Sequence, residues 1–197
     1  MEMQDSPTSS PHNSSDGYWR EWVILLIALA ATAGSIFLSV GMKPKLAACP
    51  LCFYQRSFVM AIVVILIVGL LRHRSVPSGS MLFLCIPLAV GGLGVAAFHV
   101  YLERSGVLVC PYGILKVGTA PQQSLAAYVL LTVTLLIFVA RHSSAAKALL
   151  GTVGLGIVVT LLSIWSAPDL PKPKPEDADL TSDKVTVCKP VYRRLDD

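Results

Sequence analysis

Five apolar runs, each close to the length of a membrane-spanning helix, dominate this sequence. About 20 apolar residues of helix cross the hydrocarbon core of a bilayer. A soluble domain carries about 25% charged residues, whereas this chain carries 14%. The pattern therefore excludes an ordinary soluble domain and predicts an all-α integral membrane helical bundle. The expected spans are Trp22–Val40, Leu51–Leu71, Met81–Leu102, Ser124–Ala140 and Ala148–Trp165.

The composition outside these runs divides the chain into four parts. The polar N-terminal segment, rich in Ser, Pro and Asn, cannot bury a core and is expected to be disordered. Ala31-Thr32-Ala33 has the small residues of a signal-peptidase site, but the preceding segment is net acidic, so an uncleaved anchor is expected. We expect a cytoplasmic N-tail at 1–21, a four-helix membrane domain at 22–140, a cytoplasmic loop with the fifth span at 141–166, and an extracytoplasmic tail at 167–197.

The cysteines indicate which face of the membrane the loops occupy. The Lys and Arg residues are nearly balanced between the two faces and only weakly favour an internal N-terminus. With five spans, four cysteines fall on one face, and an even number of thiols on one side is typical of an oxidising compartment. These four are Cys49, Cys52, Cys110 and Cys188. The fifth, Cys85, lies deep in the third span and is expected to be an inert packing residue.

The net charge of +4 does not indicate nucleic-acid binding. The basic residues stand singly or in pairs between apolar runs and form no stripe. The bilayer, rather than a nucleic acid, is therefore the expected partner of most of the surface.

Cys49 and Cys52 begin the second apolar run. If Cys49 is the N-cap of a helix, Pro50 takes the first helical position, where its missing N–H costs nothing. Cys52 then lies one turn above Cys49, close enough for a disulfide. The unpaired N–H groups at a helix start favour a thiolate, which is the reactive form of sulfur. The pair therefore suggests a redox dithiol at the boundary of lipid and water.

Arg56 and His99 are the two ionisable residues inside the expected spans. Arg56 shares the helical face of Cys52, so its guanidinium could stabilise a Cys52 thiolate and donate to a carbonyl of a lipid-soluble acceptor. The alternatives are a snorkelling arginine beside a structural disulfide, or half of a zinc site. For His99 the alternative is an interfacial residue beside Tyr101.

The segment Cys49-Pro50-Leu51-Cys52-Phe53-Tyr54-Gln55-Arg56 resembles the signature of the DsbB family of membrane disulfide-bond formation proteins, including its BdbC-like members. The resemblance extends over roughly Trp22 to Ala140. It implies a bacterial cytoplasmic (inner) membrane protein that passes electrons to a quinone, either ubiquinone or menaquinone. It also implies a thioredoxin-fold partner resembling DsbA, which the protein reoxidises.

The resemblance also assigns roles to individual residues. Cys49 and Cys52 match the family's quinone-proximal pair and Arg56 its quinone-contacting arginine, while His99 could exchange a proton with the quinone. The family normally has four spans and a second cysteine pair in the loop between spans three and four, but here that loop holds only Cys110. Cys188 is the expected partner, since an extended chain from Trp165 reaches up to about 75 Å.

The sequence therefore predicts a membrane disulfide oxidoreductase with catalytic Cys49, Cys52, Cys110 and Cys188, and with Arg56 and His99 at the quinone. An enzyme resembling vitamin K epoxide reductase, with the opposite direction of electron flow, is one alternative. The other is a non-catalytic membrane protein in which the four catalytic cysteines bind zinc.

Overall fold

The computed structural model describes residues 15–41, 47–72, 80–140, 146–167, 181–183 and 185–191. Residues 1–14 of the predicted disordered N-tail (1–21) lie outside the described residues, whereas 15–21 are helical as the first turns of α1, so the prediction is wrong for that part. The predicted extended Pro-Lys-Pro-Lys-Pro spacer at 171–175 also lies outside the described residues. The long helices are α1 (Ser15–Val40), α2 (Pro50–Leu71), α3 (Ser80–Arg104), α4 (Ala120–Ala140) and α5 (Ala146–Trp165). Shorter elements are β1 (Leu108–Val109), the 3-10 turn η1 (Ile114–Lys116) and β2 (Lys189–Pro190).

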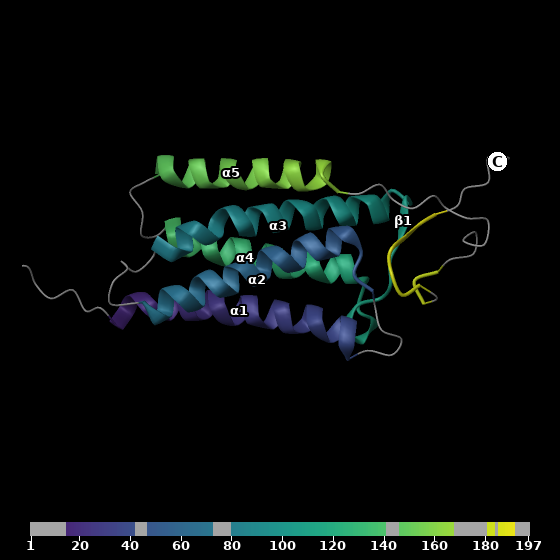
Figure 1. Ribbon diagram of the computed structural model, residues 1–197, viewed down its shortest axis with the longest axis horizontal. Helices are drawn as coiled ribbons and strands as arrows, with labels where there is room; N and C mark the ends of the chain where they lie inside the picture. Colours follow the sequence, from purple (N-terminus) through teal and green to yellow (C-terminus); the bar gives the residue numbers. More distant parts are fainter. Residues whose placement is uncertain are drawn as a thin grey trace, which may run out of the picture.

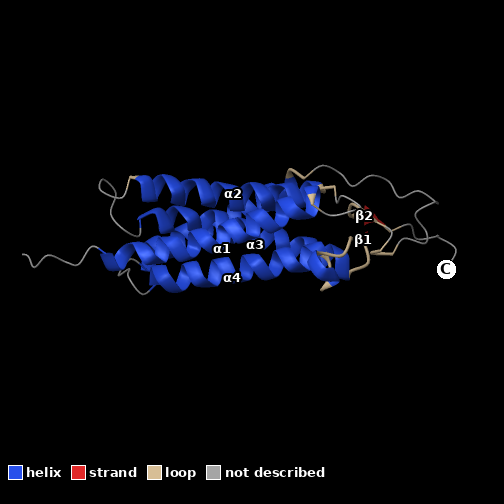
Figure 2. Cartoon of the chain, turned by 90° about the horizontal axis from the view of Figure 1, so that it is seen from below, coloured by secondary structure: helices blue, strands red, loops and turns tan. Residues whose placement is uncertain are grey.

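All five long helices are sufficiently long and apolar to cross a membrane, so the predicted all-α integral membrane bundle is confirmed. The helices lie side by side along the long axis of the molecule (Figures 1 and 2). Large apolar side chains such as Leu26, Leu71 and Leu150 are exposed on their outer faces. Such faces suit contact with lipid, because a bilayer offers no water to solvate polar groups.

Helix α3 is the centre of the bundle. It packs against α2, α4 and α5, whereas α1 packs against α2 and α4. As Figure 1 shows, α5 and α1 therefore lie on opposite sides of the bundle. The core is formed by buried apolar side chains of the first four helices, among them Ile24, Ala28, Ile62, Leu66, Ile86, Ala89, Leu131 and Leu135.

Close contacts at glycines join α3 to its neighbours. A Cβ at Gly94 would lie 2.4 Å from Thr160 of α5, and a Cβ at Gly156 of α5 would lie 2.6 Å from Val90. Small residues allow helices in a membrane to approach in this way. By contrast, no atom of the described residues lies within 4 Å of a Cβ built at Gly151 or Gly154, so these two glycines of α5 make no such close contact.

One end of the bundle gathers three segments that are far apart in sequence: the residues before α2, the α3–α4 connection, and the C-terminal segment. β1 and β2 pair antiparallel, with Leu108 opposite Pro190. The backbone N–H of Ala47 donates to the carbonyl of Thr186 at 2.8 Å, and that of Val191 donates to Val107 at 3.0 Å. The C-terminal segment is therefore attached to both loops at the end where α2 begins.

Candidate active site

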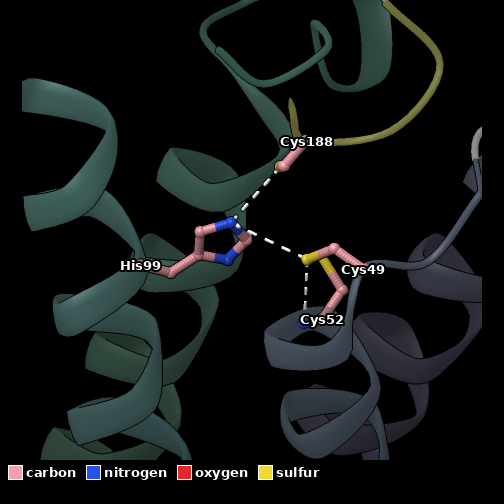
Figure 3. Close-up of side chains that lie close together, drawn as sticks. All are labelled: Cys49, Cys52, His99 and Cys188. Atoms are coloured by element: carbon pink, nitrogen blue, oxygen red, sulfur yellow. Dashed lines mark hydrogen bonds between the residues drawn. The ribbon is translucent and has the colours of Figure 1, made fainter. Parts of the chain in front are cut away.

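The start of α2 places the first two cysteines. Cys49 is the N-cap, with extended backbone angles, and Pro50 follows at the first position of the helix. The Cys52 backbone N–H donates to Cys49 Sγ at 3.3 Å, so the sulfur satisfies one of the unpaired donors of the first turn. The two sulfur atoms lie 2.8 Å apart. The predicted N-cap geometry is thus confirmed, and the two thiols point to the same side of the helix start (Figure 3).

His99 lies between this pair and Cys188 of the C-terminal segment (Figure 3). Its side chain, on α3, has 0% exposure. Its Nε2 is 3.8 Å from Cys49 Sγ, 3.3 Å from Cys188 Sγ and 3.5 Å from Cys110 Sγ. One imidazole nitrogen therefore contacts sulfur atoms from three separate segments of the chain.

Cys110 and Cys188 form a disulfide between residues that are 78 positions apart in sequence. The β1–β2 pairing holds the two cysteines together, since Cys110 directly follows β1 and Cys188 directly precedes β2. Cys110 is 1% exposed, whereas Cys188 is partly buried. Cys188 is therefore the less buried of the two residues.

The surroundings of Cys49 favour its ionised form. The contact with the Cys52 thiol, whose S–H can donate to a thiolate, lowers the pKa of Cys49 well below that of an ordinary thiol. His99 lowers this pKa further through its hydrogen bond and its charge, while burial acts in the opposite direction. Cys49 is therefore suited to act as a nucleophile in thiol–disulfide exchange.

Cys52 opens onto a cavity of about 430 Å³ between α1, α2, the start of α4 and the α3–α4 connection. This volume falls within the range of small-molecule sites in proteins. The lining is mostly apolar, with side chains such as Ile27, Leu38, Val59, Ile114 and Leu130. Arg56 and Cys188 also reach the cavity wall. A cavity of this kind suits an apolar molecule with a few polar atoms.

Arg56 is held against α1. Its Nε donates to Ser35 Oγ at 2.9 Å, and its Nη2 donates to the Ser35 carbonyl at 2.9 Å and to Ser39 Oγ at 2.7 Å. These bonds use two of the three guanidinium nitrogens and leave Nη1 for another acceptor. The arginine is thus anchored inside the bundle, and the interpretation as a snorkelling residue does not describe its contacts.

Gln55 is a polar residue of the cavity that the sequence analysis did not identify. It is 4% exposed and lines the cavity beside Arg56. Its Oε1 accepts a hydrogen bond from Ser124 at 2.6 Å. With the amide in this orientation, Nε2 has no hydrogen-bond partner among the described residues. A buried amide donor without a partner costs free energy, so the position is suited to donate to a bound molecule. The signal in the sequence was its place next to Arg56 within the segment that resembles the family signature.

The six predicted site residues do not all share one location. The structure brings Cys49, Cys52, Cys110, Cys188 and His99 together at the start of α2. Arg56 and His99 were both predicted at a cofactor, yet the cavity wall formed by the described residues includes Arg56 and not His99. Cys85, predicted to be inert, is a free and fully buried cysteine within the hydrophobic core.

Comparison with known proteins identifies relatives for the part of the chain that holds Cys49, Cys52, His99 and Cys110. The family model of disulfide bond formation protein DsbB matches residues 19–127, which is more than half of the chain. The SPbeta prophage-derived disulfide bond formation protein B of Bacillus subtilis (strain 168) is 34% identical over 100 residues, which are 49% of this chain. The match spans 64% of the length of that relative. No solved structure matches.

Proposed function

Because this chain belongs to the DsbB family of disulfide bond formation proteins, we propose that it reoxidises an extracytoplasmic DsbA-like thiol oxidase and transfers the electrons to a membrane quinone. One observation carries this proposal. The two cysteine pairs meet at His99, and Cys52 of the first pair also opens onto the apolar cavity. A route for electrons from a soluble dithiol to a lipid-soluble acceptor needs both features.

The first step takes place at the disulfide. A thiolate of the reduced partner attacks Sγ of Cys188, the less buried residue, and a mixed disulfide forms as the bond to Cys110 breaks. The Cys110 sulfur leaves with the electron pair, 3.5 Å from His99 Nε2. The second thiol of the partner then resolves the mixed disulfide. The partner is oxidised, and Cys110 and Cys188 are left as thiols.

The second step passes the same two electrons to the first pair. Cys188 Sγ lies within 4.8 Å of both Cys49 Sγ and Cys52 Sγ, so direct exchange between the pairs needs only a small movement. Cys49 and Cys52 are free thiols in the structure, so this step requires that they have first passed two electrons to the quinone and formed a disulfide. A Cys188 thiolate then attacks that disulfide, the Cys110–Cys188 disulfide is restored, and Cys49 and Cys52 become thiols again. His99 Nε2 contacts sulfur atoms of both pairs and is placed to hold the proton that moves between them.

The residues around the cavity fit a quinone. Arg56 Nη1 and Gln55 Nε2 are donors suited to carbonyl oxygens, and the apolar lining suits a ring with a lipid tail. A bound quinone supplies a two-electron acceptor beside Cys52. The anchoring of Arg56 by Ser35 and Ser39 holds one donor in place before the acceptor binds.

The test is an assay of the full chain in detergent with a reduced DsbA-like partner and a short-chain ubiquinone or menaquinone analogue. We expect oxidation of the partner and reduction of the quinone in equal amounts. Arg56→Met should raise the KM for quinone by at least about tenfold, since a charged hydrogen bond contributes about 1.5–3 kcal/mol. Cys85→Ala, at a buried thiol away from the site, is the control and should behave as wild type.

Two outcomes would contradict the proposal. One is a partner that stays reduced although the protein is folded and quinone is present. The other is net electron flow from quinol to the partner at matched concentrations, which would favour the alternative with the opposite direction. The measured reduction potentials of the two cysteine pairs would identify which case applies.

A further inference from the structure

His99 and the cysteines around it offer the types of ligand that bind zinc in proteins. Cys49 Sγ, Cys52 Sγ, His99 Nε2 and Cys188 Sγ all lie within 4.8 Å of one another (Figure 3). We propose that the fully reduced protein binds one Zn²⁺ through these four atoms, and that bound zinc stops thiol–disulfide exchange. The binding is independent of the proposed function, whereas the inhibition rests on it.

The distances between the four atoms support this site. Zinc bonds of about 2.3 Å to sulfur and 2.0–2.1 Å to nitrogen place the corners of a tetrahedron about 3.5–3.8 Å apart. His99 Nε2 is 3.3 Å from Cys188 Sγ and 3.8 Å from Cys49 Sγ. The two sulfur atoms of Cys49 and Cys52 lie 2.8 Å apart and would need to separate by about 1 Å. The other pairs of these atoms lie within 4.8 Å, so the side chains would need to move by up to about 1 Å to reach tetrahedral coordination.

The types and spacing of the ligands also fit zinc. Three thiolates and one imidazole form one of the common structural zinc sets, and two cysteines separated by two residues form its usual short pair. The His99 nitrogen that faces the sulfur atoms is Nε2, so Nδ1 carries the proton when Nε2 binds metal. This set differs from the four-cysteine alternative of the sequence analysis, because Cys110 is replaced by a histidine that the fold places among the thiols.

The redox state controls whether the site is complete. Cys188 Sγ is bonded to Cys110 in the disulfide, which leaves at most three of the four ligands. A dithiol that donates two electrons breaks this bond, becoming a disulfide itself while Cys110 and Cys188 become thiols. Zinc then displaces one proton from each of the three thiols, Cys49, Cys52 and Cys188. The oxidised protein therefore lacks the site.

Zinc coordination blocks the reactions of the same sulfur atoms. A thiolate whose lone pair is bound to zinc is a poor nucleophile for a disulfide, and the four-coordinate site leaves no position open. Zinc should therefore trap the enzyme in its reduced form. The effect should be strongest when the electron acceptor is scarce, because reduced enzyme then accumulates.

The test uses the full chain in detergent, reduced with a phosphine and freed of reductant under anaerobic conditions. Titration with Co²⁺ should give the absorption of a tetrahedral thiolate site with one ion per chain, and Zn²⁺ should displace the cobalt. The oxidised protein should bind neither ion at this site.

Two cysteine variants form a matched pair. Cys110→Ser removes the disulfide but keeps all four ligands, so after reduction it should bind zinc as wild type does. Cys188→Ser removes the same disulfide together with one ligand, and His99→Ala removes another. Each of these two changes should weaken zinc binding at least about 100-fold, since even the loss of an outer partner of a zinc ligand costs 10–100-fold. Equal binding by the oxidised protein, or wild-type affinity in Cys188→Ser and His99→Ala, would overturn the site.

A parallel activity assay separates this inference from the proposed function. With chelator present, the wild type should oxidise its partner. Zn²⁺ added in excess of the chelator should inhibit this oxidation and leave Cys110 and Cys188 reduced. Activity without any zinc binding to the reduced protein would overturn the zinc site alone. Zinc binding by a protein that is inactive with chelator would instead contradict the oxidase function and leave the binding site established.

Discussion

At the scale of single residues, the cavity contains polar groups whose hydrogen bonds are incomplete. Nε and Nη2 of Arg56 donate hydrogen bonds to Ser35 and Ser39 of α1. The side-chain oxygen of Gln55 accepts a hydrogen bond from Ser124, whereas its amide nitrogen has no partner among the described residues. Unpaired donors inside an apolar cavity are costly unless a bound molecule accepts from them. We therefore expect both residues to contribute to binding of the acceptor rather than to stability.

Gln55→Leu tests this view. The change removes the donor, so the KM for quinone should rise about tenfold, equivalent to about 1.4 kcal/mol, with little change in kcat. The melting temperature should fall only modestly, because the lost N–H has no described partner and the lost oxygen accepts a single hydrogen bond from Ser124. Thr132→Val, which removes a buried hydrogen bond to Ala89 away from the cavity, is the control and should leave KM unchanged. A large fall in stability with normal KM would assign Gln55 a structural role.

The acidity of Cys49 gives a second prediction at this scale. Because Cys52 and His99 lower its pKa, the thiolate persists as the pH falls below the range in which an ordinary thiol, with a pKa near 8.5, is ionised. In the reduced protein with chelator present, alkylation of Cys49 should remain fast at about pH 6. In His99→Ala the pKa should rise, and the rate profile should shift to higher pH. Mass spectrometry of alkylated peptides would measure both profiles, and a wild-type rate that rises only above about pH 8 would contradict the assignment.

At the scale of elements, the contact between α3 and α5 supports the position of the C-terminal segment. Gly94 and Gly156 allow these helices to approach closely, and α5 leads into the segment that carries Cys188. The other principal attachments of that segment are β1–β2 and the hydrogen bond of Thr186 to Ala47. Displacement of α5 should therefore affect the disulfide as well as the packing.

A pair of glycine variants separates these effects. In Gly94→Ala the new methyl group would lie 2.4 Å from Thr160, so the change should destabilise the protein by about 1–3 kcal/mol and slow formation of the Cys110–Cys188 disulfide. In Gly154→Ala no atom in the described part of the chain lies within 4 Å of the new atom, so the higher helix propensity of Ala should keep or slightly raise stability. Thermal unfolding in detergent and non-reducing peptide maps would measure both. Equal stability of the two variants would show that α5 is not closely packed at Gly94.

At the scale of the whole molecule, much of the architecture could be predicted because a bilayer fixes the length of an apolar helix. The five runs became five helices, extended by a few residues at some ends, such as Ala120 instead of Ser124 at the start of α4. The N-cap at Cys49 was predictable because Pro50 suits the first helical position. The Cys110–Cys188 disulfide was predicted because the family resemblance implies a second cysteine pair and the C-terminal tail is long enough to supply Cys188, and the structure pairs these residues.

The sequence could not predict how the helices rotate against one another. Contacts of Arg56 with Ser35 and Ser39 depend on that rotation, as does the difference between Gly94, which meets α5, and Gly154, which does not. The same limit applies to His99. Its position along α3 was clear, but only the fold shows that Nε2 lies against the sulfur atoms. Its predicted contact with a cofactor stays a prediction.

The central claim is that electrons from the soluble partner enter through the Cys110–Cys188 disulfide, although the family match ends at residue 127 and does not include Cys188. The most direct measurement is partner reoxidation by Cys188→Ser, compared with oxidation of its own Cys49 and Cys52 thiols by added quinone. We predict that partner reoxidation is lost while quinone still oxidises Cys49 and Cys52. Partner reoxidation by Cys188→Ser at the wild-type rate would contradict the account.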